Sequence, residues 1–102
     1  KANDLATAVT GKRLGHPVRS LKTPFTRRYM AAEYTQISDE DLESMGAGAL
    51  RLAVVEGDVQ NGCFLAGQIA SMVTKEQPAA EILREIIAEA EPLLKGAPAW
   101  VK

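Results

Sequence analysis

Three glycines at five-residue intervals run through the stretch GDVQNGCFLAGQ, from Gly57 to Gln68. They form two overlapping G-x-x-x-x-G spacings, Gly57 with Gly62 and Gly62 with Gly67. In a nucleotide-binding P-loop, Lys and then Ser or Thr follow at once, because the lysine reaches the phosphates and the hydroxyl binds Mg²⁺. Neither spacing here is followed by those residues. A nucleoside triphosphate site of this type is therefore excluded.

The same stretch still resembles the approach to a ligand. Apolar residues at helical spacing predict a helix over residues 63–73 that begins near Gly62 or Cys63, whose free N–H groups would point at whatever lies in front. A helix start packed against its own domain is an equally weighted alternative. Glycine inside a helix costs about 1 kcal/mol relative to alanine. Gly67 would therefore indicate the close approach of another backbone or of a ligand.

Few side chains in this sequence have the chemistry of a catalytic or metal site. His16 is the only histidine, and no cysteine or carboxylate stands at ligand spacing from it, so a surface or turn role is favoured and no metal site is predicted. Cys63 has no histidine neighbour; a helix N-terminus could lower its pKa, but a packed, inert thiol is favoured. No acid, base or nucleophile set is found, and we predict no catalytic residue in this chain.

The elements that would position the glycine stretch begin with a hairpin. Two short strands are expected over residues 6–10 and 17–22, joined by a turn from Gly11 to Gly15. Residues 1–23 then form a basic β-hairpin, and residues 24–102 a helical part. Pro24 predicts a helix start in TPFTRRYMAAEY, and Ser38 with an acidic first turn predicts the next one.

Further helices are expected along the rest of the chain. ALRLAVVE returns to helical spacing, and Gly57 follows it where a left-handed cap is needed. PAAEILREIIAEAEPLLKG is the best-marked helix, with Pro92 expected to kink or end it. Trp100 is interpreted as an anchor packed onto another surface. The predicted class is α+β: a single domain, residues 1–102, with a short hairpin and then four to five helices.

Composition limits the classes of protein to consider. The chain has 102 residues, 46% hydrophobic and 25% charged, which is typical of a globular domain and not of a disordered one. Its longest apolar runs, such as LAVV, fall far short of the ~20 residues of a membrane span. The single cysteine excludes an internal disulfide and predicts a cytoplasmic protein. The absence of an initial methionine suggests a piece of something longer.

The net charge of −1 is the sum of two parts of the chain with opposite charge. Residues 1–28 carry seven basic and one acidic side chain, a charge of +6, whereas the rest carries five basic and twelve acidic ones, a charge of −7. One interpretation is a non-enzymatic interaction module whose basic hairpin, with Phe25 and Tyr29, binds an acidic partner or nucleic acid. No nucleic-acid fold signature is present, so nucleic acid is not predicted as a partner. An ordinary solvated surface is the commoner explanation.

Longer strings carry a more specific signal. TGKRLGHPVRSLKTPFTRRY, MGAGALRLAVVEGDVQNGCFLAGQIASMV and the final amphipathic helix resemble the C-terminal part of the flavin-dependent enoyl-acyl-carrier-protein reductases. These belong to one FMN-dependent TIM-barrel superfamily with the nitronate monooxygenases, also called 2-nitropropane dioxygenases. The resemblance covers nearly the whole chain, and the MGAGAL…AGQIA string favours the reductase branch.

The resemblance implies a function for a longer parent protein. The chain would be the cap part, roughly the last third, of an FMN-binding TIM-barrel enzyme that reduces trans-2-enoyl thioesters with NADH or NADPH in fatty-acid biosynthesis. The barrel and its active-site histidine would precede Lys1, and His16 does not match that histidine. Expected partners are this N-terminal barrel portion, acyl-carrier-protein thioesters and a second copy in a homodimer. The isolated piece is expected to be inactive. A nitronate monooxygenase, using FMN and oxygen, is the alternative enzyme.

Residue roles carry over only onto GCFLAGQ, which resembles the segment that folds over the flavin and the substrate mouth. The resemblance implies that the first four residues face the cofactor or the acyl chain, that the second glycine permits close packing, and that the glutamine orients neighbouring backbone. The family usually has a small or hydroxylated residue at Cys63, and methionine is common at Leu65. The implied cofactor-binding residues are Gly62, Cys63, Phe64, Leu65, Gly67 and Gln68.

Overall fold

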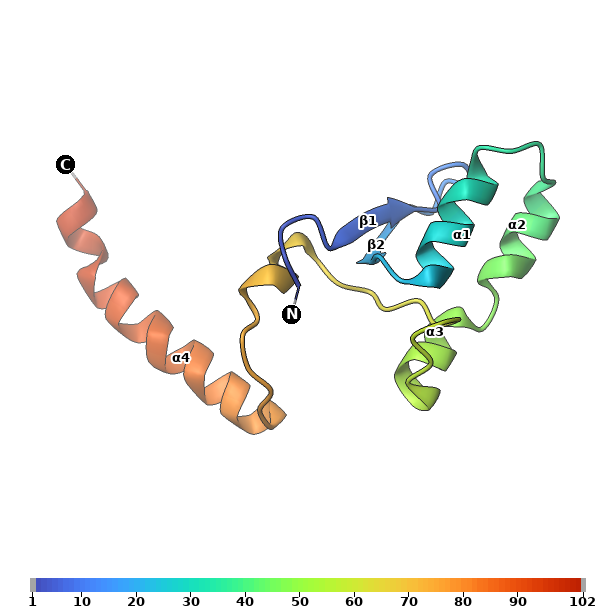
Figure 1. The fold of residues 1–102 in the computed structure, drawn as a ribbon. Coiled ribbons are helices and arrows are strands. Elements are labelled where there is room, and N and C mark those ends of the chain that lie inside the picture. The colour runs from blue at the N-terminus through green and yellow to red at the C-terminus, as the bar shows by residue number, and fades with distance from the viewer. Residues whose placement is uncertain (1, 102) are drawn as a thin grey trace.

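The hairpin expected at the start of the chain is present in the computed structural model, which describes residues 2–101. Strands β1 (Thr7–Thr10) and β2 (Val18–Leu21) pair antiparallel, with Ala8 opposite Ser20 and Thr10 opposite Val18 (Figure 1). The connecting turn needs Gly11, whose φ is +79° and whose Cβ, if present, would overlap the carbonyl of His16. Both predicted strands are confirmed, each slightly shorter than expected.

Two capped helices follow the hairpin, as predicted. Helix α1 (Pro24–Glu33) begins where the Thr23 side chain accepts a hydrogen bond from the backbone N–H of Thr26. Helix α2 (Asp39–Gly46) begins where Ser38 does the same for Asp41. The side-chain oxygen satisfies one of the N–H groups that a helix start leaves without a partner. Both starts are therefore determined by residues adjacent to them.

A small core holds these helices together. It consists of Phe25, Tyr29, Leu42 and Ala49, with the two aromatic ring centroids 5.9 Å apart. Arg13 closes the far end of this core: its guanidinium forms an ion pair with Asp39, with Nη2 and Oδ1 2.9 Å apart, and also donates to the Thr35 carbonyl. The hairpin turn is thereby joined to the connection between α1 and α2.

A third helix lies beside this core and changes its winding. Helix α3 (Ala49–Arg51) continues as a π-helical turn, η1 (Leu52–Glu56), which the sequence did not predict. The helix ends at Gly57, whose φ of +64° is the left-handed conformation expected for its cap. Glycine adopts this conformation without the steric cost that other residues meet.

The helix predicted over residues 63–73 is wrong. Residues 63–66, here called the bridging segment, are extended and lie along β2, with Leu65 paired to Ser20. The Leu21 N–H donates to the Phe64 carbonyl at 2.8 Å, and the Ala66 N–H to the Arg19 carbonyl at 3.2 Å. Since these bonds go to another strand, they are not available to a helix.

Only a short 3-10 turn, η2 (Gln68–Met72), occupies the second half of that region. Gly67 precedes it with φ −76° and ψ 172°, which is ordinary extended backbone. The predicted cost of a glycine inside a helix therefore does not arise at Gly67. Close approach is required instead at Gly62, which is buried and whose Cβ would lie 2.9 Å from the Ala53 Cα.

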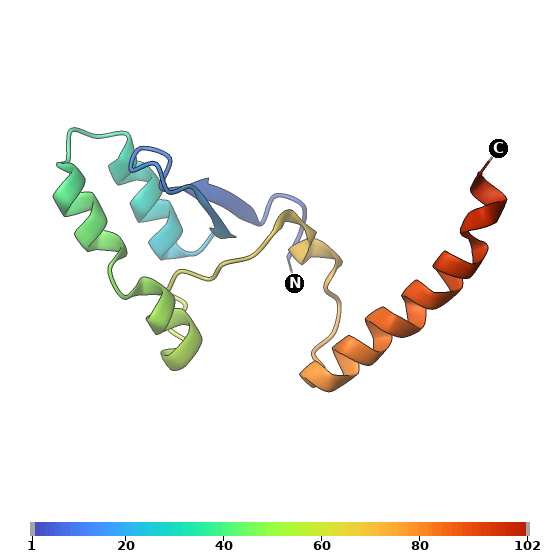
Figure 2. The ribbon, with the colours of Figure 1, turned by 180° about the vertical axis from the view of Figure 1, so that it is seen from behind.

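The last helix stands apart from the rest. Helix α4 (Ala79–Gly96), predicted from its apolar stripe, is followed by a 3-10 turn, η3 (Ala97–Trp100). Both ribbon views show it reached through an extended connector and separated from the hairpin and α1–α3 (Figures 1 and 2). Pro92 lies inside α4 and does not end it. Trp100 is 74% exposed, so the predicted packed anchor is not formed within residues 2–101.

This arrangement makes the chain long and leaves much apolar surface uncovered. Its extents are 56 × 35 × 20 Å and its radius of gyration is 18.2 Å, against about 13 Å for a compact domain of this size. The apolar side chains of α4 are exposed. The predicted α+β class is confirmed, with two strands and three main helices, α1, α2 and α4. None of the helices in the described residues is long and apolar enough to cross a membrane.

Candidate functional site

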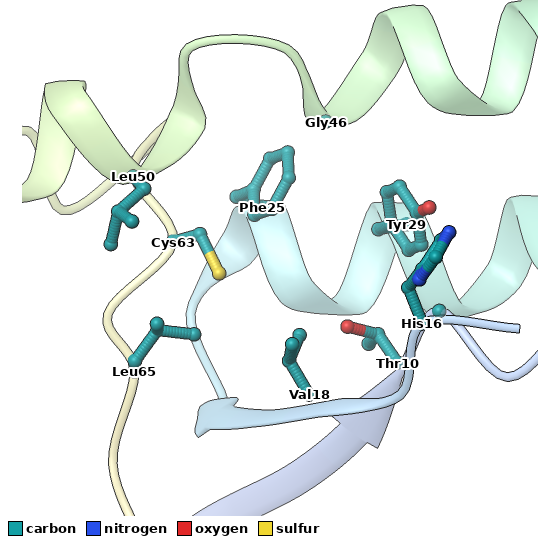
Figure 3. Close-up of a pocket in the computed structure, with 10 residues that line it drawn as sticks. Thr10, His16, Val18, Phe25, Tyr29, Gly46, Leu50, Cys63 and Leu65 are labelled. Carbon is teal, nitrogen blue, oxygen red and sulfur yellow. The ribbon is translucent and has the colours of Figure 1, made fainter. Parts of the chain in front are cut away.

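A pocket of about 230 Å³ lies between the hairpin, α1 and the bridging segment (Figure 3). Phe25 and Tyr29 of α1 and Leu50 of α3 contribute to its lining. Its lining comes from the hairpin, α1, the end of α2, α3 and the bridging segment: Thr10, Gly11, His16, Val18, Phe25, Tyr29, Gly46, Leu50, Cys63 and Leu65.

Strand geometry explains why these side chains meet. Opposed residues in an antiparallel pair point to the same face of the sheet, and so do residues two apart along a strand. Thr10 is opposite Val18, and Ser20, two residues further on, is opposite Leu65. Ser20 faces α1, because its hydroxyl lies 3.3 Å from that of Thr26. The bridging segment therefore adds Leu65 to the same sheet face that carries Thr10 and Val18.

The pocket is apolar at one end and polar at the other. Leu50, Cys63 and Leu65 gather at the first end, and the Tyr29 hydroxyl lies beside His16 at the second (Figure 3). Burial raises the pKa of Tyr29, and the carboxylates of Glu33 and Glu43 raise it further. The phenol is therefore protonated at neutral pH and is not suited to act as a base.

The loop before the bridging segment, residues 57–62, is held by a dense set of hydrogen bonds. The Asp58 carboxylate accepts from the backbone N–H groups of Gln60 and Asn61 at 2.9 and 3.0 Å, and from the Asn61 side-chain amide at 3.0 Å. Arg28 on α1 donates to the Gln60 carbonyl and to Asn61 Oδ1, both at 3.1 Å. The loop is thus connected to α1.

This loop determines where the bridging segment starts. The Gly62 N–H donates to the Asp58 carbonyl at 2.8 Å, and the Cys63 N–H donates to the Ala49 carbonyl at 2.9 Å. The Thr23 hydroxyl lies 3.4 Å from the Gly62 carbonyl. These bonds fix the position of Cys63. Leu65 lies two residues further along the extended chain, so its position depends on that of Cys63.

Acidification is expected to loosen the 57–62 loop. Hydrogen bonds from the Asn61 side chain first, and then from the backbone of Asn61 and Gln60, lower the pKa of Asp58. A carboxyl with a depressed pKa stabilises the folded loop above its unfolded pKa, near 4, and loses that contribution as pH falls through the folded value. The amide NMR shifts of Gln60 and Asn61 should move together below about pH 4. Asp58→Asn should remove that transition, and an unchanged titration in this variant would contradict the assignment.

The structure separates the residues that the sequence grouped together. Cys63 and Leu65 line the pocket, whereas Phe64 does not, because alternate residues of an extended segment face opposite sides. Gly62 is buried at the end of the loop, and Gly67 and Gln68 are exposed beyond the bridging segment. The six predicted residues therefore do not form one continuous surface.

Cys63 is not at a helix N-terminus, where the sequence placed it; it is partly buried and packs against the core, as expected for a packed thiol. His16 is exposed in the connection between β1 and β2, as expected, and it also lines the pocket. Within residues 2–101, no group of three or more His, Cys, Asp or Glu side chains could hold a metal ion.

Sequence reasoning missed the hairpin and α1 side of the pocket. Val18 and Leu50 were assigned to elements but not to a site, and Phe25 and Tyr29 were considered only as part of a basic binding surface. One available signal was the two-residue alternation of β2, which places Val18 and Ser20 on a single face. The partnership of that face with Leu65 depends on a long-range strand pairing that the sequence does not display.

The bridging segment is suited to one kind of contact with a flavin. Its Cys63 and Ala66 N–H groups are already bonded within the chain, so they cannot bind phosphate or ring atoms. Leu65 is 52% exposed and offers an apolar surface next to exposed Gly67 and Gln68. An exposed apolar side chain is compatible with the flat face of an isoalloxazine ring, and the bonded N–H groups of Cys63 and Ala66 are not available to its phosphate.

Two solved structures similar to this chain are those of an enoyl-acyl-carrier-protein reductase, which confirms the resemblance read from the sequence. FabK from Thermotoga maritima is 37% identical over 99% of this chain and 32% of its own, with a TM-score of 0.84. A single-site mutant of the same FabK is 34% identical over 99% and 29%, with a TM-score of 0.73. This chain thus spans about a third of the length of FabK. No protein-family model matches the sequence, and no curated protein matches it.

Proposed function

We propose that this chain is the C-terminal third of an FMN-dependent enoyl-acyl-carrier-protein reductase and forms one wall of its active site. The observation that carries the proposal is the similarity to FabK over 99% of the chain, at 37% identity and a TM-score of 0.84. The elongated shape and the exposed apolar face of α4 support it, because a larger neighbouring part would cover them.

The proposal gives this chain a limited chemical part. FMN, when bound by the parent protein, supplies hydride transfer from NADH or NADPH to the double bond of a trans-2-enoyl thioester. Leu65 presents its apolar side chain to the reacting groups and excludes water from them. Cys63 lies behind it in the pocket, and the 57–62 loop fixes the position of both. The donors that grip the cofactor and the proton donor belong to the remainder of the parent.

The parent protein tests this proposal directly. Purified full-length protein should show flavin absorption, should be reduced rapidly by NADH or NADPH without oxygen, and should then be reoxidised by a trans-2-enoyl thioester. Flavin reduction by an alkyl nitronate, with no response to the enoyl thioester, would identify a nitronate monooxygenase and overturn the proposal. A parent protein that binds no flavin would overturn both enzymatic interpretations.

The basic N-terminal region is also proposed to dock the acidic carrier protein. The structure distinguishes basic side chains that are used internally from those that are not. Arg13 and Arg28 bind backbone carbonyls, and Arg19 donates to the Thr7 hydroxyl at 3.0 Å. Arg27 is exposed, and its side chain has no hydrogen-bond or ion-pair partner among the described residues. Within this region Arg27 is therefore better placed than Arg28 to bind an external partner.

Reversing the charge at Arg27 should weaken carrier docking selectively. Arg27→Glu in the full-length protein is expected to raise KM about fivefold for a carrier-bound substrate, since it removes an attraction and adds a repulsion. KM for the matching coenzyme A thioester should change less than twofold. Arg84→Glu on the polar side of α4 is the control and should leave both values unchanged. An equal rise for both substrates would contradict docking at Arg27.

A further inference from the structure

The pocket next to Leu65 contains space that its lining side chains do not fill, and its mouth is apolar. Three half-exposed apolar side chains from separate segments surround that mouth: Val18 at 41%, Leu50 at 49% and Leu65 at 52% exposure. Phe25 and Tyr29, each 8% exposed, form its wall on α1 (Figure 3). An apolar cavity of this kind gains stability when an apolar group displaces its water.

We infer that this pocket receives the distal part of the acyl chain of the enoyl thioester, and that Val18 and Leu50 at its mouth determine how well longer chains enter it. The inference rests on the proposed function. Its geometric basis is that Leu65 belongs both to the surface proposed to face the flavin and to the pocket mouth. A substrate whose double bond lies over the flavin next to Leu65 has its tail directed past that side chain into the pocket.

The lining side chains favour the hydrocarbon tail of the acyl group over the pantetheine arm and the nicotinamide. The pantetheine arm carries amides and the nicotinamide carries a carboxamide, and each would need hydrogen-bonding partners when buried. Val18, Leu50 and Leu65 offer none through their side chains. The Tyr29 hydroxyl and His16 lie at the far end, and the only other polar side chains of the lining are the small ones of Thr10 and Cys63. A methyl terminus that reached this end would displace water from polar groups without replacing its hydrogen bonds, which sets a limit to chain length.

The pocket is large enough for part of an acyl chain. Its volume of about 230 Å³ has room for several methylene groups, and a longer chain would extend beyond it. Each methylene buried should lower KM about fourfold until the pocket is full.

Substitution of Val18 tests the assignment. In the full-length holoenzyme, Val18→Trp should raise KM at least tenfold for a twelve-carbon trans-2-enoyl coenzyme A thioester, and change KM for the four-carbon one less than twofold. Val18→Ala, which enlarges the pocket, should lower the ratio of the twelve-carbon to the four-carbon KM. Val9→Trp is the matched control, because Val9 lies on β1 with its side chain on the opposite face of the hairpin.

The outcomes distinguish failure of the acyl pocket from failure of the proposed function. Equal changes for both substrates in Val18→Trp, or a chain-length profile that Val9→Trp alters in the same way, would overturn the acyl pocket while the proposed function stands. A wild-type holoenzyme that reduces no enoyl thioester would overturn the proposed function, and the acyl pocket with it. If the Val18→Trp protein fails to bind flavin, two other variants make the same comparison. Val18→Ala enlarges the pocket instead of filling it, and Leu50→Trp fills it from another segment of the chain.

Discussion

Gly62→Ala in the full-length protein is expected to lower turnover of enoyl thioesters by roughly 100-fold. A Cβ at this position would lie 2.5 Å from the Asp58 carbonyl oxygen and 2.9 Å from the Ala53 Cα and backbone nitrogen. All three neighbours are backbone atoms, so no flexible side chain can move aside. The chain itself must shift, and the bridging segment begins at the next residue.

The size of the effect follows from what the shift would break. The Gly62 N–H bonds to the same Asp58 carbonyl that the new Cβ would approach, and Cys63 is bonded to Ala49. Overpacking of this kind lowers the free energy of unfolding by about 1–3 kcal/mol. Displacement of Leu65 by about 1 Å would misplace the wall over the reacting groups, and such an error can reduce a rate by about two orders of magnitude.

The measurement is steady-state turnover together with flavin content. The expected result is a large fall in kcat with FMN still bound, because the phosphate grip is proposed to lie outside this chain. Gly96→Ala is the control: nothing lies within 4 Å of a Cβ there, and the backbone is helical with φ −83°. Wild-type turnover in Gly62→Ala would show that the position of the bridging segment does not matter to the reaction.

Local signals in the sequence were sufficient for most of the fold. Helices α1 and α2 begin where they were expected because Thr23, Pro24 and Ser38 satisfy or remove free backbone N–H groups at those positions. The hairpin turn and the Gly57 cap were found for a similar reason, since each needs a positive φ that glycine adopts readily. In all these cases the cause lies within a few residues of its effect.

The bridging segment was misread because its cause lies elsewhere in the chain. Leu65, Ile69 and Met72 recur at helical spacing, yet the backbone of residues 63–66 pairs with β2. The two flanking glycines, Gly62 and Gly67, bracket a stretch of strand length, and this signal could have favoured an extended segment. Its partner strand, however, could not be identified without knowing the three-dimensional path of the chain.

Only part of the candidate site could be predicted from the sequence, for the same reason. Resemblance to a family identified the GCFLAGQ stretch, including Cys63 and Leu65, which do line the pocket. Val18 and Tyr29 join them through strand register and helix packing, which a single sequence does not display. The extended conformation also divides the stretch, since Phe64 faces away from its two neighbours.

Ala90→Asp in α4 is expected to prevent assembly of the full-length protein. Ala90 lies in the middle of the apolar stripe formed by Ile82, Ile86, Ile87 and Leu93, whose side chains are exposed in this chain. The chain spans about a third of FabK, so we propose that the remainder of the parent covers this stripe. A carboxylate buried there without a partner would destabilise the assembly by several kcal/mol. Ala88→Asp makes the same change on the opposite side of α4 and should have little effect. Soluble yield, thermal unfolding and flavin content measure both variants; equal behaviour of the two would show that the apolar stripe of α4 is not an internal interface.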